Sequence, residues 1–177
     1  MPRSGIRANY QESVGIRVNK LSHVDSKNRP AMVDVSDKVA THRVAHARTI
    51  VEFPAEVAAR FVDGDIATAK GPVFATAIVA GVMGAKRTHD LIPFCHPVGL
   101  DNCSITITLD NDGRAVVDCI CKVHHRTGVE MEALTGATIA ALTIYDMCKV
   151  LSHEITIRDT RLISKSGGKE DYHHAGA

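Results

Sequence analysis

The sequence predicts an α+β fold, with an antiparallel sheet of the ferredoxin-like kind and helices packed on one face. Two β-prone runs, 103–110 and 115–123, alternate apolar and polar residues on either side of a turn. Two longer apolar segments, 73–88 and 130–151, are typical of helices. The expected order of elements is β-α-α-β-β-α-β, which favours a sheet covered by helices on one side.

Length and composition fit one compact unit. The chain has 177 residues, of which 45% are hydrophobic and 23% charged, and this is sufficient for a single core. We expect a flexible N-terminal tail at 1–31, one α+β domain at 32–164 and a C-terminal tail at 165–177. The net charge of +1 argues against a general nucleic-acid binder, so any basic site must be local.

The first elements are expected between residues 42 and 64. Residues 48–53 (RTIVEF) are β-prone and predict a strand. Pro54 suits the first turn of a helix, because its missing N–H costs nothing there. That helix is expected over 55–62, and Gly64 is suited to cap its end.

The middle of the chain predicts a buried helix and a hairpin. Segment 73–88 is apolar on nearly every side, so we expect it to be buried all round, in a core or a subunit interface. The hairpin turns at 111–113 (NDG), and alternate residues of its two strands face the core. These residues are Cys103, Ile105, Ile107 and Leu109, then Ala115, Val117, Cys119, Cys121 and Val123.

The last elements are a long helix at 130–151 and a strand at 154–158 that extends as far as Ile163. Residues 165–169 (KSGGK) predict a loop. Helical spacing gives the long helix a buried stripe and a second, more polar stripe. The buried stripe is Ala137, Ala141, Ile144, Cys148 and Leu151, and the second stripe is Glu132, Thr135, Asp146 and Lys149.

Five cysteines without a signal peptide favour a reducing compartment, and we expect the cytoplasm. The longest apolar run, 71–85, is shorter than the ~20 residues that a membrane span needs, so we expect no membrane association. Residues 1–20 carry Arg3, Arg7, Arg17 and Lys20 but also Glu12. A disordered tail fits this composition, and an organelle transit peptide stays open.

Residues 95–97 (CHP) are open to nucleophilic, metal-binding or structural interpretations. Cys119 and Cys121, taken with the histidines at 124–125, suggest zinc. One residue between the cysteines is too few for a zinc knuckle, and both cysteines face the core, so we expect no metal site. For His96 a hydrogen-bonded structural role is favoured, unless other observations link it to a site.

Several charged residues have both a structural and a functional interpretation. Asp146 and Lys149 are neighbours on a helix and could form a surface ion pair or an acid–base pair. Glu130 and Glu132 could serve only to favour a helix N-terminus through its dipole.

Two further pairs are equally ambiguous. Residues 70–71 and 86–87 could be solvated charges or, as a set, cations for a polyphosphate, since lysines act on phosphate as point charges. Neither a Walker-type loop nor a GxGxxG loop occurs, so the two common nucleotide folds are unsupported.

Taken together, five segments resemble the molybdenum cofactor biosynthesis protein C family, the cyclic pyranopterin monophosphate synthases. The similarity covers about residues 21–170, and several long motifs in the right order make a chance match unlikely to arise. The segments are 31–36 (AMVDVS), 86–97 (KRTHDLIPFCHP), 127–135 (TGVEMEALT), 142–149 (LTIYDMCK) and 165–169 (KSGGK).

The resemblance implies a single catalytic domain at 32–164. Its reaction would convert 3′,8-cyclo-7,8-dihydro-GTP into cyclic pyranopterin monophosphate, with release of diphosphate. The resemblance assigns catalysis to Asp146, Lys149 and Lys70. It assigns substrate contacts to Phe94, Cys95, His96, Met131, Glu132 and Glu130, with Lys86 and Arg43 near the phosphates.

The resemblance implies no firm cofactor, and Mg²⁺ stays open as a companion of the triphosphate. It also implies a homo-oligomer, a hexamer built as a trimer of dimers. Two departures from the family occur. Residues 124–126 (HHR) stand where the family commonly has a smaller residue, Gly and Lys, and His89 stands at a position that is often Trp or Ser.

Two further hypotheses remain. A non-catalytic ferredoxin-like module that senses a nucleotide or a pterin is the alternative, because fold alone does not decide function. In addition, if 130–149 is one helix, Asp146 lies about 24 Å beyond Glu130, too far for one compact pocket. Either residues 130–132 precede the helix and fold back, or the site is shared between two copies of the chain.

Overall fold

The main layer of the fold is a five-stranded antiparallel sheet in the order β4-β5-β1-β6-β7. This computed structural model describes residues 27, 29–62, 64–68 and 71–176. The predicted tail at 1–31 therefore lies almost entirely outside the described residues. The strands are β1 (Thr41–Glu52), β4 (Asn102–Leu109), β5 (Ala115–His125), β6 (Thr156–Ser166) and β7 (Tyr172–His173).

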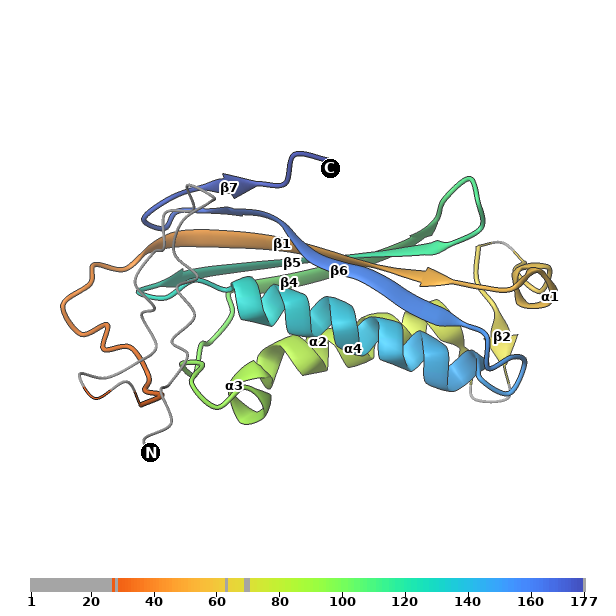
Figure 1. Cartoon of the computed structure of the whole chain (residues 1–177), viewed down its shortest axis with the longest axis horizontal. Helices are drawn as coiled ribbons and strands as arrows, with labels where there is room; N and C mark the ends of the chain where they lie inside the picture. Colours follow the sequence, from red (N-terminus) through yellow and green to blue (C-terminus); the bar gives the residue numbers. More distant parts are fainter. Residues whose placement is uncertain (1–26, 28, 63, 69–70, 177) are drawn as a thin grey trace, which may run out of the picture.

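Two helices, α2 (Val73–Lys86) and α4 (Glu130–Cys148), lie side by side against one face of this sheet (Figure 1). The α+β fold with helices on one face is therefore confirmed. The central strand β1 pairs with β5 on one side and β6 on the other, as the ferredoxin-like order of elements requires.

Short elements fill the connection between β1 and α2, where the predicted helix at 55–62 is wrong in length. The observed helix α1 (Ala55–Ala58) has one turn. It ends because the backbone of Val62 exchanges hydrogen bonds with Asp65, at 2.9 and 3.1 Å, and this bridge draws the chain away. The remaining short strands are β2 (Ala67–Thr68) and β3 (Gly71–Pro72).

The helix predicted at 73–88 is divided. α2 ends at Lys86, and a one-turn helix α3 (Thr88–Leu91) follows. The buried Thr88 hydroxyl donates to the carbonyl of Ala85 at 3.0 Å, which satisfies a free carbonyl at the end of α2.

The core lies between the sheet and the helix layer and confirms the predicted alternation of β5, whose residues 115, 117, 119, 121 and 123 are all buried. Glycines let α2 and α4 approach closely. A Cβ at Gly81 would come 2.8 Å from the carbonyl oxygen of Gly136, and one at Gly84 would come 2.7 Å from Ile139. The predicted buried stripe of α4 is confirmed for Ala137, Ala141, Ile144 and Cys148, whereas Leu151 follows the helix and is half-buried.

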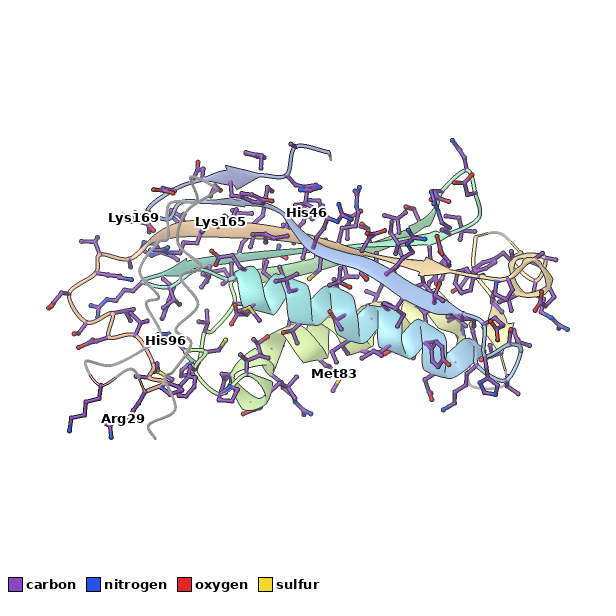
Figure 2. All side chains as sticks on the ribbon, in the orientation of Figure 1. Arg29, His46, Met83, His96, Lys165 and Lys169 are labelled. Atoms are coloured by element: carbon purple, nitrogen blue, oxygen red, sulfur yellow. The ribbon has the colours of Figure 1, made fainter. Side chains whose placement is uncertain are left out.

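The prediction that segment 73–88 is buried all round is wrong for the single chain. Val79 is 60% exposed and Met83 50% exposed. Met83 lies on the side of the helix layer that faces away from the sheet (Figure 2). One face of α2 is therefore covered by the sheet and α4, and the other is free to contact a further molecule.

The C-terminal elements also differ from the prediction. β6 begins at Thr156 and continues to Ser166, and β7 pairs with Ser164 and Lys165, so part of the expected tail belongs to the sheet. β6 is irregular, because its register against β1 shifts and Asp159 has a positive φ of 55°.

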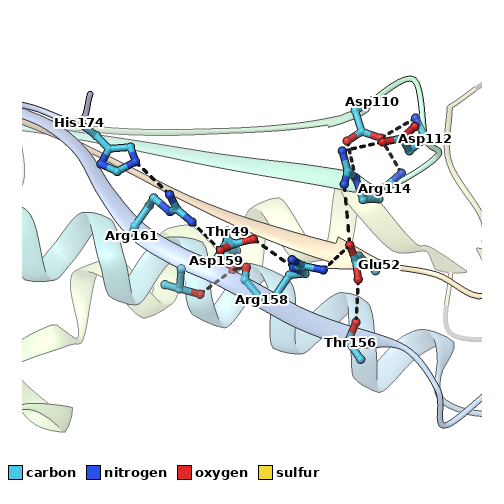
Figure 3. Close-up of polar contacts among 11 residues, drawn as sticks. Thr49, Glu52, Asp110, Asp112, Arg114, Thr156, Arg158, Asp159, Arg161 and His174 are labelled. Carbon is cyan, nitrogen blue, oxygen red and sulfur yellow. Dashed lines mark hydrogen bonds and ion pairs between the residues drawn. The ribbon is translucent and has the colours of Figure 1, made fainter. Parts of the chain in front are cut away.

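Charged side chains support this irregular stretch (Figure 3). Asp159 accepts hydrogen bonds from Arg158 and Arg161, and Arg158 also donates to Glu52 of β1 at 2.9 Å. A network of this kind was not predictable from the β-propensity of the segment.

Among the residues described, no helix has the combination of length and apolar character that a membrane crossing requires.

Candidate active site

A cavity of about 370 Å³ lies at the N-terminal end of α4. All six residues predicted to contact substrate and one predicted phosphate contact line it. They come from the loop after α3, from the first turn of α4 and from β1. The lining residues are Val33, Val35, Lys38, Arg43, Phe94, Cys95, His96, Val98, Arg126, Thr127, Gly128, Glu130, Met131 and Glu132.

His96 joins two parts of the cavity wall. Its Nε2 donates a hydrogen bond to the carbonyl oxygen of Val33 at 2.8 Å. Because a carbonyl oxygen can only accept, this ring nitrogen carries a proton. The segment around Val33 and the loop around His96 are therefore held together across the mouth of the cavity. His96 therefore makes the structural hydrogen bond that the sequence favoured, and it also lines the cavity, whereas its contact with a substrate stays a prediction.

Burial shifts the pKa of two titratable groups that line the cavity. Glu132 is only 5% exposed, and this desolvation raises the pKa of its carboxyl group, with Glu130 as a second cause. Burial also raises the pKa of the Cys95 thiol, with the charge of Glu132 adding to the effect. A thiol with a raised pKa is a poor nucleophile, so the geometry does not favour the nucleophilic interpretation of residues 95–97.

A second cavity of about 470 Å³ adjoins the first, since Lys38, Arg43, Gly128 and Glu130 line both. It adds Lys165 and Lys169, which lie toward the same end of the molecule as His96 (Figure 2). Together with Arg126, these side chains form what we call the cationic cluster, which consists of Lys38, Arg43, Arg126, Lys165 and Lys169.

The backbone positions the cationic cluster. Arg43 is fixed at the start of β1, where its Nε donates to the carbonyl of His125 at 2.9 Å. Lys165 pairs with Glu130, Nζ to Oε1 at 3.1 Å, and so joins β6 to the first turn of α4. Gly167 has a φ of 79°, and a Cβ there would collide with the carbonyl oxygen of His42, so the turn after β6 requires glycine.

Asp146 and Lys149 lie at the opposite end of α4. They form an ion pair of 2.8 Å, and the hydrogen bond that the Lys149 ammonium donates to Asp146 raises the pKa of Lys149. Both side chains are about half exposed and line a third cavity, of about 660 Å³, with Thr68, Met147 and residues 150–153.

The predicted site residues do not converge within one chain. All three residues 130–132 belong to α4, so the hypothesis that they precede the helix and fold back is wrong. Glu132 and Asp146 are fourteen residues apart on one unbroken helix, which separates them by about 21 Å along the axis. The structure thus places the predicted site residues in two groups, one at each end of α4.

One predicted cation is not brought to these cavities, and another lies outside the described residues. Lys86 ends α2 in an exposed position and is absent from the walls described above. Lys70 lies outside the described residues.

Several lining residues were not predicted as site residues, namely Lys38, Val98, Thr127, Gly128, Lys165 and Lys169. The segments 127–135 and 165–169 had been singled out as motifs, and the two lysines of 165–169 were the available signal. Arg126 had been noted only as a departure, yet its side chain lines the cavity.

The comparisons with known proteins agree with one another over most of the chain. The model of the MoaC family matches residues 32–168. The cyclic pyranopterin monophosphate synthase of Xanthomonas axonopodis pv. citri is 55% identical over 157 residues, which cover 88% of this chain and 94% of that protein. A synthase of the same name from Desulfitobacterium hafniense is 47% identical over 153 residues, or 86% of this chain and 93% of that protein.

A longer relative contains the same region. The molybdenum cofactor biosynthesis protein 1 of Dictyostelium discoideum is 51% identical over 168 residues, and the chain spans only 27% of its length. The family match covers all the elements from β1 to β6 and both ends of α4. The chain belongs to the MoaC family.

Proposed function

We propose that this chain is a cyclic pyranopterin monophosphate synthase, a lyase of molybdenum cofactor biosynthesis. It would convert 3′,8-cyclo-7,8-dihydro-GTP into cyclic pyranopterin monophosphate and diphosphate. The observation that carries the proposal is the 55% identity to a synthase of this name over 94% of that protein's length. A sensing module is not favoured, because relatives of matching length are named as synthases and the chain retains both Asp146 and Lys149.

The cationic cluster suits the triphosphate of such a substrate. Lysine and arginine side chains from four segments converge on the two adjoining cavities, and fixed cations stabilise the charge that develops on departing diphosphate. Lys70 and Lys86 remain predicted phosphate contacts, although Lys86 does not line the cavities described above. Mg²⁺ bound to the triphosphate also stays a prediction.

The cavity at the start of α4 suits the heterocycle. Phe94 and Met131 offer apolar surface there, and both are more than a third exposed toward it. The Glu132 carboxyl, whose pKa is raised by burial, is suited to exchange hydrogen bonds with ring nitrogens in its protonated form. His96 would hold the wall of the cavity through its bond to Val33.

The Asp146–Lys149 pair is suited to the proton transfers that ring opening and ring closure need. A carboxylate and an ammonium 2.8 Å apart can act as base and acid toward one ligand. The comparable carboxylate–ammonium pair at the N-terminal end of α4 is Glu130 with Lys165, 3.1 Å apart, which lines the second cavity and joins α4 to β6.

A site shared between protomers would unite these parts. Two antiparallel copies of α4 would bring Glu132 of one chain beside Asp146 of another, across the 21 Å that separates them in one chain. The exposed Val79 and Met83 on α2 provide apolar surface for such an assembly. We therefore propose a homo-oligomer with shared sites, and a trimer of dimers as its form, with a cytoplasmic location that rests on the five free cysteines.

The decisive experiment is incubation of the full chain with 3′,8-cyclo-7,8-dihydro-GTP, followed by mass detection of the cyclic product and diphosphate. Formation of both at equal amounts supports the synthase. Binding of the intermediate without turnover would identify the chain as a sensing module instead.

A further inference from the structure

Three thiols meet on the core side of the hairpin formed by β4 and β5. The sulfur of Cys103 lies 4.0 Å from that of Cys119 and 3.8 Å from that of Cys121, and the latter two sulfurs are 3.9 Å apart. In the part of the chain that the structure describes, this is the one group of three or more potential metal-ligating side chains within coordination range of each other.

Strand pairing explains why these residues meet. Cys119 and Cys121 are alternate residues of β5 and point to the same face. Cys103 on β4 lies directly opposite Cys121 in the register, so its side chain joins them from the neighbouring strand. Local spacing groups Cys119 and Cys121 with the histidines that follow them, whereas only the cross-strand register brings Cys103 close.

The three thiols are mostly buried, and solvent reaches them only at Cys103. Cys119 and Cys121 are fully buried, whereas Cys103 is half-buried. The helix above them is fitted to their sulfurs, because a Cβ at Gly136 of α4 would come 2.7 Å from the sulfur of Cys119. Lys86 at the end of α2 acts electrostatically on Cys103 and supplies positive charge beside the group.

The triangle of sulfurs has the size of a coordination site. Its mean side is 3.9 Å, so its centre lies about 2.25 Å from each sulfur (the side divided by the square root of three). This is close to the ~2.3 Å bond between a d¹⁰ metal ion and a cysteine thiolate. An ion at the centre would need little or no movement of the sulfurs.

The number of ligands decides between metals. Structural zinc is almost always held by four protein ligands, and three are present in this group. Soft thiolate ligands suit copper(I), zinc and iron–sulfur clusters. Structural zinc and the common clusters take four protein ligands, one more than this group offers, so copper(I) is the ion that three thiolates fit best. We propose that Cys103, Cys119 and Cys121 form a three-thiolate binding site for a soft monovalent ion of the copper(I) class.

Binding would be a coordination step without electron transfer. Each thiol that coordinates gives up its proton to solvent, and the ion stays monovalent. The ion would join β4 to β5 beneath Gly136, one helical turn from Glu132 of the substrate cavity, or about 6 Å along the axis of α4. This proposal does not depend on the proposed function of the chain.

The test is a competition titration of the reduced, metal-free full chain under nitrogen. Copper(I) is supplied with bicinchoninate as the competing chelator, and X-ray absorption gives the copper coordination. We expect one ion per chain, bound by three sulfurs at about 2.3 Å. Cys103→Ser and Cys119→Ala should lose this binding, whereas Cys148→Ala, which removes a buried thiol outside the group, should retain it.

A second measurement uses only the wild-type chain and so does not depend on the folding of variants. Cys103 and Cys95 are both partly exposed, so iodoacetamide should alkylate both in the metal-free protein, Cys95 more slowly because burial raises its pKa. One equivalent of copper(I) should protect Cys103 and leave Cys95 reactive.

Three results would overturn the proposal. These are equal alkylation of Cys103 with and without copper(I), copper binding that survives Cys103→Ser, and preference for one zinc ion with a fourth ligand. Failure of the fully reduced chain to compete for copper(I) would mean that the thiols only fill space in the core.

Discussion

Lys149 and Asp146 are joined by a 2.8 Å ion pair at the exposed end of α4, three residues apart on the helix and remote from the cavity at its other end. The bond raises the pKa of Lys149, so its ammonium form persists well above neutral pH. An exposed pair of this kind contributes little to folding. Its position on a cavity wall is therefore the stronger reason for its presence.

We expect Asp146→Asn and Lys149→Ala each to lower turnover by about 10²–10⁴-fold, the usual range for acid–base groups. Their thermal unfolding should stay close to that of the wild type. Glu154→Gln, an exposed acid in the loop after α4, is the control and should retain activity. Near-normal turnover of either variant would exclude its catalytic role, and unfolding of both would favour a purely structural pair.

Removal of a cation from the cationic cluster should affect only ligands with a phosphate tail. Lys169→Ala should weaken the binding of GTP, used as an unreactive triphosphate probe, and leave guanosine binding unchanged, because cation–phosphate attraction acts only on the tail. Isothermal titration measures both. Lys122→Ala, an exposed lysine of β5 outside the cavity walls, is the control. Lys86 does not line these cavities in the single chain. If it also lies outside the site in the assembly, Lys86→Ala should leave GTP binding unchanged, as Lys122→Ala does.

Mixed oligomers test the shared site. Glu132→Ala and Asp146→Ala chains, each inactive alone, should regain part of the activity after they are unfolded and refolded together. One site of a mixed pair would carry both lesions and the other neither. The assay needs native mass spectrometry to prove mixing. Mixed oligomers as inactive as their parents would contradict this sharing, and a fully active monomer would contradict any shared site.

The buried carboxyl of Glu132 should make stability fall as pH rises. Its folded-state pKa is raised above the reference value of 4.5, so between that value and the raised pKa the folded chain binds more protons than the unfolded chain. The free energy of unfolding therefore decreases across this window and then levels off. Urea unfolding between pH 4.5 and 8 should show this decrease in the wild type and less of it in Glu132→Gln. Glu56→Gln on α1, which is exposed, is the matched control.

The close approach of α2 and α4 should make Gly81→Ala destabilising by about 1–3 kcal/mol, the usual cost of overpacking. The added methyl group would meet the carbonyl oxygen of Gly136 at 2.8 Å and the side chain of Ile105. Gly99→Ala adds the same group where nothing lies within 4 Å and should be nearly neutral. Equal stability of the two variants in urea would mean that the helices can separate without cost.

Much of the fold was predictable because its signals are local. The alternation in β5 and the apolar stripe of α4 depend only on side-chain spacing, and both were correct. The early end of α1 and the extension of β6 to Ser166 were not predictable, since they depend on the bridge between Val62 and Asp65 and on pairing with β7.

Some residues of the candidate site were likewise predictable from the sequence, and others were not. Residues 94–96 and 130–132 were predicted from motifs and line one cavity. Lys165 and Lys38 were missed because their approach to the cavity comes from strand pairing and loop packing that no periodicity encodes. The distance between the ends of α4 was calculable in advance, since a continuous helix has a fixed rise per residue.

The unbroken length of α4 has a genetic consequence if the sites are shared. In a cell that expresses two versions of the chain, a lesion at one end of α4 would spare one site of each mixed pair. A chain altered at both Glu132 and Asp146 would place one lesion in each site of a pair with a normal partner. Such a doubly altered chain would therefore be dominant, although either single alteration would be partly recessive.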